Sequence, residues 1–96
     1  MAKVTTSRED RIACTGGTLV IDDTAAHTGL TGYCIECDAD AVVSACTGYD
    51  PSGNAYNFKT ALNWVTLKAG AKYFTAMNYY IDAITLTSGS ISVHQI

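Results

Sequence analysis

Four cysteines and two histidines are the residues of this chain best suited to metal or redox chemistry. They are Cys14, Cys34, Cys37, Cys46, His27 and His94. The pair Cys34-x-x-Cys37 has zinc-knuckle spacing, and Cys14 and Cys46 could complete a four-thiolate site. However, residues 33–38 have the pattern of a strand, in which positions three apart point to opposite faces. Buried free thiols, one or two disulfides, and a zinc site remain open, and of these we expect buried free thiols, with no metal and no cofactor.

The acidic, histidine and hydroxyl side chains match no known catalytic motif. Gly-x-Ser-x-Gly, a Gly-rich phosphate loop and His-Glu-x-x-His are all absent from the sequence. The run 50–54 superficially resembles a calcium loop, but Ala55 and Ala61 stand where such a loop needs glycine and a bidentate glutamate. We therefore interpret Asp50 as a solvated turn residue, and His27 and His94 as ordinary surface histidines. The sequence predicts no enzyme, no catalytic residue and no small-molecule substrate.

The elements that would position any such groups are short strands. Apolar residues alternate with small polar ones, and Gly, Pro, Asn and Asp interrupt the pattern at short intervals. Turns are predicted at 38–40, 50–54, 68–70 and 88–89. Strands are predicted at 18–22, 33–38, 41–47, 61–67, 71–77, 81–87 and 90–95, and 55–60 is expected to be a loop or a short edge strand. About seven short strands of this kind predict an all-β fold, a small antiparallel β-sandwich or a jelly-roll-like barrel.

The first residues differ from the rest of the chain. Residues 1–11 are polar and lack periodicity, so they are expected to be either an unstructured terminus or an extended arm that reaches a neighbouring subunit. In the second case, Arg8 and Arg11 are candidate contacts with the partner. Residues 12–96 are expected to form a single β domain.

The composition favours an assembly protein. Charged residues make up 16% of the chain, below the average of about 25%. The net charge is −3 and the six basic residues are scattered, which argues against a nucleic-acid partner. No apolar run approaches the roughly 18 residues of a membrane helix, and polar residues rather than an apolar segment follow Met1-Ala2-Lys3. We therefore expect synthesis in a cytoplasm, with no signal peptide and no membrane partner.

The aromatic residues provide the remaining candidates for a working surface. Trp64 alternates with Leu62 in a predicted strand, so we expect it in the core. Tyr79 and Tyr80 straddle a predicted turn, where one of the two must point away from the core. Aromatic side chains with a polar tip are enriched at protein interfaces. Tyr79 and Tyr80 are therefore the candidate interface residues of the domain.

The C-terminal third carries a family resemblance. The run Leu67-Lys-Ala-Gly-Ala-Lys-Tyr73, followed by Ile84-Thr-Leu-Thr-Ser-Gly-Ser-Ile-Ser-Val93, resembles small β-rich virion proteins of tailed bacteriophages, including capsid decoration (cement) proteins. Many of these end in a hairpin of this composition. The resemblance implies a homotrimer that binds the major capsid protein on the outer capsid surface, bridges neighbouring subunits and stabilises the lattice. The virion is then its location, after synthesis in the host cytoplasm.

Three function classes follow from these observations. The first is the structural virion protein, which needs a rigid body and repeated contacts but no catalytic residue. The second is a receptor- or carbohydrate-binding module of a phage tail fibre or spike, for which Trp64 and Tyr80 could stack on sugars. The third is a small metal or redox protein that uses its cysteines. The first is the function predicted from the sequence.

Overall fold

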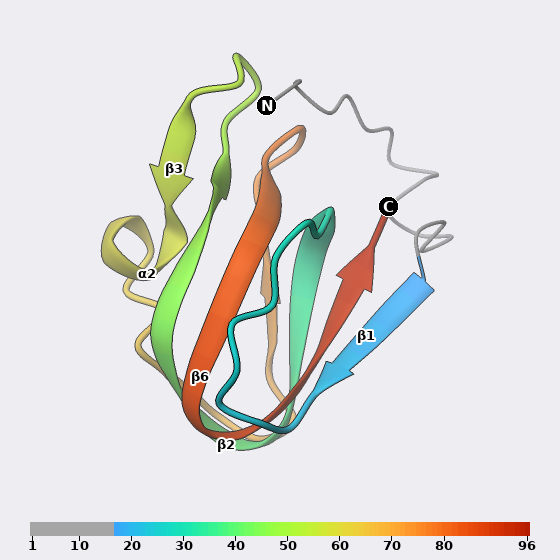
Figure 1. Ribbon diagram of the computed structural model, residues 1–96, viewed down its shortest axis with the longest axis vertical. Helices are drawn as coiled ribbons and strands as arrows, with labels where there is room; N and C mark the ends of the chain where they lie inside the picture. Colours follow the sequence, from blue (N-terminus) through green and yellow to red (C-terminus); the bar gives the residue numbers. More distant parts are fainter. Residues whose placement is uncertain (1–16) are drawn as a thin grey trace.

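The computed structural model describes residues 17–96, which form an all-β fold, as predicted. These residues also include one short helix, which was not predicted. Its elements are shown in Figure 1. They are β1 (Gly17–Ile21), β2 (Gly32–Tyr49), β3 (Ala55–Asn57), α2 (Phe58–Ala61), β4 (Thr66–Leu67), β5 (Lys72–Phe74) and β6 (Tyr80–Gln95).

Two long strands form the centre of the fold. The 18 residues of β2 and the 16 residues of β6 pair antiparallel along almost their whole length, from Cys34 opposite His94 to Cys46 opposite Ile84. Register shifts lie between Cys37 and Val42 of β2, where the double strand curves back on itself (Figure 1). Such bulges let a strand bend sharply without ending. Each long strand therefore contributes to two layers.

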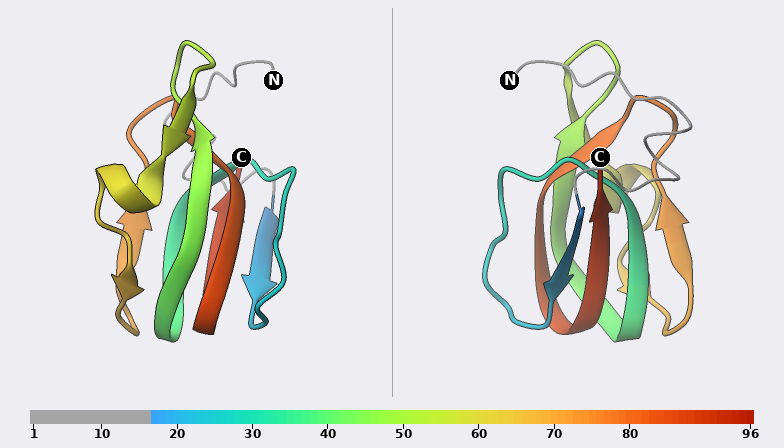
Figure 2. Two further views of the ribbon diagram at one scale, coloured as in Figure 1. Left: turned by 60° about the vertical axis from the view of Figure 1, so that its left-hand side comes forward. Right: turned by 90° about the vertical axis from the view of Figure 1, so that its right-hand side faces the viewer.

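The shorter elements extend these two layers, seen from the side in Figure 2. The first layer has the order β5, first half of β2, second half of β6, β1, with all neighbours antiparallel. In the second layer, the other halves of β2 and β6 pair, and β3 and β4 pair with β2. A bridge between His27 and Ile84 joins the 22–31 loop to this second layer.

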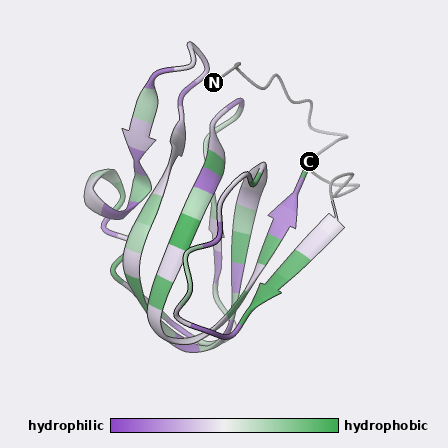
Figure 3. Cartoon of the chain, in the orientation of Figure 1, coloured by the Kyte–Doolittle hydropathy of each residue, from purple (hydrophilic) through white to green (hydrophobic). Residues whose placement is uncertain are grey.

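The core lies between the layers. Hydrophobic residues alternate with polar ones along β2 and β6 (Figure 3), so one side of each half-strand faces inward. Ile35, Ile84, Ile91 and Val93 are fully buried there. Trp64 is also in the core, as predicted, with 7% of its surface exposed.

Two predicted turns are wrong. Residues 38–40 continue β2, and Ser88-Gly89 continues β6, so four predicted strands are two. The residues at both positions form the bend, where Gly89 has φ +92° and lies against the backbone of Asp40 and Ala41. Gly89 adopts a positive φ, as a glycine in a tight hairpin turn can, but here this conformation bends a continuous strand.

The predicted strand at 61–67 is also wrong for most of its length. A helical turn, α2, begins after Asn57, whose side chain accepts a hydrogen bond from the Thr60 backbone N–H at 3.1 Å. This is the usual role of asparagine at a helix N-cap. Only Thr66–Leu67 pairs with β2, and the strand predicted at 71–77 is limited to Lys72–Phe74.

Candidate functional site

Residues 55–79 differ in composition from the rest of the described chain. They contain six of the nine aromatic residues, three lysines, and no aspartate or glutamate. They comprise β3, α2, β4, β5 and the connections between them, and their strands all pair with β2. We call this side of the molecule the aromatic wall.

The inner part of the aromatic wall is a stack of rings. Phe58 is fully buried and its ring lies 5.6 Å from that of Trp64, with 15° between the planes. Tyr56 meets Phe58 edge-on at 4.9 Å, and Tyr73 meets Trp64 edge-on at 6.0 Å. Such geometries add to the stability gained from burial alone. The N-cap at Asn57 positions this stack, because it fixes the start of the helix that carries Phe58.

The outer part of the aromatic wall is a shallow hollow of about 370 Å³. Its lining includes Tyr56, Phe58, Leu62, Phe74, Thr75 and Tyr79. Phe74 is 56% exposed and Leu62 is 42% exposed, and nearby Met77 is 45% exposed. Apolar side chains gathered in this way on a protein surface mark interaction sites.

The segment 55–79 itself carries only positive charges. Lys59 donates a hydrogen bond from Nζ to the Ser44 carbonyl at 3.1 Å, and Lys68 and Lys72 are exposed on the turn before β5 and on β5. The acidic residues of the described chain all lie outside residues 55–79. Two carboxylates of β2 lie beside this segment, since Glu36 pairs opposite Lys72 and Asp40 Oδ1 accepts a hydrogen bond from the Ala69 N–H at 2.8 Å. The aromatic wall therefore offers apolar contacts with lysines and carboxylates at its edge, which suits a protein partner with complementary polar groups.

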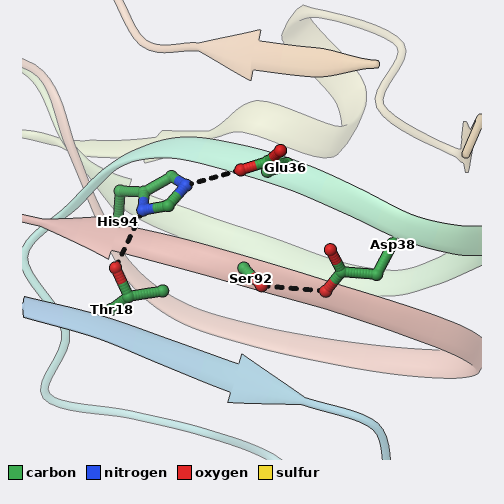
Figure 4. A network of polar contacts seen from close by, with 5 residues as sticks. All are labelled: Thr18, Glu36, Asp38, Ser92 and His94. Carbon is green, nitrogen blue, oxygen red and sulfur yellow. Dashed lines mark hydrogen bonds and ion pairs between the residues drawn. The ribbon is translucent and has the colours of Figure 1, made fainter. Parts of the chain in front are cut away.

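A second group of polar side chains lies on the outer face of the first layer (Figure 4). Thr18 Oγ1 lies 2.9 Å from His94 Nδ1, and His94 Nε2 lies 3.1 Å from Glu36 Oε1. Beside them, Ser92 donates a hydrogen bond to Asp38 at 2.8 Å. These contacts join β1, β6 and β2. No local sequence pattern predicts this network, because Thr18 and His94 are far apart in the chain and only the sheet register brings them together.

The Thr18–His94–Glu36 order resembles the hydroxyl, imidazole and carboxylate of nucleophilic enzymes. With the proton on Nε2, His94 donates to Glu36 and accepts from the Thr18 hydroxyl. Catalysis would also need donors that stabilise an oxyanion, beside a site that holds the substrate. The hollow of the aromatic wall includes none of these three residues. The contacts themselves link β1 to β6 and β6 to β2, and so help to hold β1 on the sheet.

Three of the four cysteines lie in the described chain, and they are buried free thiols, as expected. Cys34, Cys37 and Cys46 are at most 2% exposed. Burial raises the pKa of Cys46 to about 12, and it also raises the pKa of Cys37, whose Sγ donates to the Ala39 carbonyl at 3.0 Å. Cys14, which a four-thiolate site would need, lies outside the described residues. Within residues 17–96, no three His, Cys, Asp or Glu side chains are grouped as metal ligands.

Of the four candidate interface residues, one lines the hollow, one is buried, and two lie outside the described residues. Tyr79 lines the hollow, with its ring 5.0 Å from that of Tyr56. Tyr80 is only 1% exposed and packs on Tyr49 at 5.4 Å, and burial raises its pKa. Tyr80 therefore cannot contact a partner in this fold, and we correct that assignment. Arg8 and Arg11 lie outside the described residues.

Two loop carboxylates, Asp50 and Asp23, make hydrogen bonds to nearby residues of their own loops. Asp50 accepts hydrogen bonds from the backbone N–H groups of Ser52 and Asn54, both at 2.9 Å, and the bond from Asn54 is the main cause of its lowered pKa. Asp23 lies 2.8 Å from His27 Nε2, and this contact lowers the pKa of Asp23. Asp50 is thus a turn residue, as interpreted from the sequence.

Comparison with known proteins gives no relative: no family model, no curated protein and no solved structure matches the chain. Within residues 17–96, no helix is long and apolar enough to cross a membrane.

Proposed function

We propose that this chain is a structural virion protein, a decoration (cement) protein that binds the major capsid protein on the outer capsid surface and stabilises the lattice. The observation that supports the proposal best is the hollow of the aromatic wall. Exposed Phe74 and Leu62 line it, exposed Met77 directly follows the lining residue Ala76, and residues 55–79 carry lysines but no carboxylate. Such a surface fits a protein partner, because apolar anchors supply the affinity and complementary charge orients the encounter.

The capsid as partner is inferred from the resemblance of residues 67–73 and 84–93 to phage decoration proteins. In the structure these residues belong to the β4–β5 region and to β6. They support the aromatic wall and the core rather than forming the hollow themselves. The resemblance also implies a homotrimer, in which three weak contacts with a symmetric lattice act together. In this proposal the protein has no catalytic role.

One observation favours the alternative, a receptor- or carbohydrate-binding module. The rings of Tyr56 and Tyr79 both line the hollow, and tyrosine can stack on a sugar while its hydroxyl makes a hydrogen bond. Trp64 and Tyr80, which the sequence suggested for sugar stacking, are buried. A carbohydrate site would therefore use Tyr56 and Tyr79 instead.

Co-sedimentation with capsids tests the proposal. Empty capsids assembled from the major capsid protein encoded with this chain are mixed with wild-type protein, Leu62→Asp and Val42→Asp. Val42 is a matched control, because it is 38% exposed against 42% for Leu62 and does not line the hollow. We expect the wild type and Val42→Asp to sediment with capsids and Leu62→Asp to remain in the supernatant.

Two results would contradict the proposal. If wild-type protein stays in the supernatant, or if both variants bind equally well, the hollow does not bind the capsid. Binding to a glycan array that is lost in Tyr79→Ala would instead support the carbohydrate-binding alternative.

A further inference from the structure

The first layer has two edges that no described strand covers. Its order is β5, β2, β6, β1, and within residues 17–96 the strand at each end pairs on one side only. The two end strands lie at opposite sides of the molecule, β1 in blue and β5 in orange in Figure 2. An uncovered edge readily accepts another strand, so proteins either protect such edges or use them for assembly.

The exposed side chains at these two edges are complementary. Val20 on β1 is 59% exposed, and Asp22 directly after β1 is also exposed. Phe74 on β5 is 56% exposed, and Lys72 on the same strand is exposed. In the sheet register, Val20 lies opposite Ser92, Ser92 opposite Glu36, and Glu36 opposite Lys72. Val20 and Lys72 therefore belong to one cross-strand row on the outer face. Phe74 belongs to the next row on the same face.

We propose that β1 of one copy pairs antiparallel with β5 of the next copy and so continues the first layer from one subunit to the other. Because neighbours in this layer are antiparallel throughout, β5 of a second copy placed beside β1 continues the alternation. In the register that sets Val20 opposite the next copy's Phe74, Asp22 lies opposite that copy's Lys72. One register thus satisfies both the apolar pair and the charged pair, which are the cross-strand pairs that stabilise sheets.

A second copy fits these edges because of the distribution of charge. Residues 17–31 contain Asp22 and Asp23 and no lysine or arginine, whereas residues 55–79 contain three lysines and no acid. Exposed Asp22 of one copy and exposed Lys72 of the next therefore offer opposite charges in a head-to-tail arrangement. A contact between two different surfaces is heterologous, and it closes into a ring when the rotation between copies permits.

The inference rests on one part of the proposed function, the homo-oligomer, and not on the capsid. The incoming β1 would cover the β5 rim of the hollow at Phe74. Leu62 and Tyr79 also line the hollow, and they remain available to a further partner.

Disulfide cross-linking of the full chain tests the contact. In a Cys14→Ser background, Val20→Cys protein is mixed with Phe74→Cys protein under mild oxidation. Non-reducing electrophoresis should show a linked dimer in the mixture. Val42→Cys replaces Val20→Cys in the control, and that mixture should give little dimer. A dimer from Val20→Cys alone would indicate that β1 pairs with β1, and would overturn the proposal.

A charge exchange tests the register by a second measurement. Asp22→Lys and Lys72→Asp should each weaken self-association in sedimentation experiments by about 1.5- to 5-fold, the range for an exposed ion pair. The double variant should recover the wild-type association constant. A wild-type chain that is monomeric at every concentration, or a double variant weaker than either single one, would overturn the inference. A monomer that still binds capsids would leave the proposed function intact.

Discussion

Gly89→Ala should destabilise the protein far more than Gly70→Ala, because only Gly89 lies beneath another strand. Both glycines have a positive φ, +92° and +84°. A Cβ at Gly89 would lie 2.3 Å from the Asp40 carbonyl oxygen and 2.4 Å from the Ala41 Cα, whereas a Cβ at Gly70 meets nothing within 4 Å. The pair of variants therefore separates the cost of backbone strain from the cost of close packing.

The magnitudes follow from these two contributions. A left-handed conformation costs an alanine about 1–2 kcal/mol, which is the whole loss expected for Gly70→Ala. At Gly89 the methyl group also forces backbone atoms apart, and overpacking of this kind adds about 1–3 kcal/mol. Since rigid backbone rather than a flexible side chain must move, we expect a total near the upper end, about 3–5 kcal/mol.

Urea unfolding followed by tryptophan fluorescence measures both losses. Trp64 is the single tryptophan and is buried, so its emission reports the folded core. Equal losses for the two variants would refute the reasoning. They would indicate that Ser88-Gly89 closes an ordinary hairpin with nothing packed over the glycine, rather than the bend of a continuous β6.

Three further predictions concern the core and the loops. Phe58→Ala should cost about 3–5 kcal/mol in urea unfolding, because it empties a fully buried ring site stacked on Trp64. The buried thiols should stay unreactive toward Ellman's reagent near neutral pH until the protein is denatured. This holds above all for Cys46, because its pKa of about 12 leaves almost no thiolate. Rapid labelling of Cys46 in the native protein would contradict its burial. The hydrogen bond from the Asn54 backbone N–H lowers the pKa of Asp50 from its ordinary value. The ionised carboxylate therefore stabilises the folded state at neutral pH. This stabilisation is lost as the pH falls through the lowered pKa. Asp50→Asn should therefore unfold more easily than wild type at neutral pH and no more easily in strong acid, and a pH-independent difference would contradict this assignment.

The fold class could be predicted from the sequence because alternation is a local property. Ile91 and Val93 are spaced two apart with polar neighbours, and they are fully buried on the inner face. Strand continuity could not be predicted in this way. Ser88-Gly89 has the composition of a tight turn, and only the approach of Asp40 and Ala41 from β2 shows that it is a bend.

The start of α2 does have a local sequence signal. Asn57 precedes Phe58-Lys-Thr-Ala, and asparagine is among the best N-cap residues. Strand propensity of the following residues suggested a strand instead. The buried ring of Phe58 and the bond from Asn57 to Thr60 favour the helical turn, since they fix its first residues.

The candidate site was only partly visible in the sequence. The absence of acidic residues from 55–79 can be read directly, and so can the number of aromatic residues. Which tyrosine of the pair at 79–80 is exposed cannot be read, because Tyr80 is buried by its cross-strand neighbour Tyr49. The link of Thr18, His94 and Glu36 likewise depends on a register that no local pattern encodes.

The two long strands connect the surfaces used in both proposals. The strands of the aromatic wall pair with β2, and β1 pairs with β6, so the hollow proposed to bind the capsid and the β1 edge lie on opposite edges of one bent double strand. Because β2 and β6 run through both layers without a break, movement of the aromatic wall relative to β1 would have to disrupt the ladder between them. A protein that bridges subunits of a lattice needs this property, since its contacts add to one another only while the distance between them is fixed.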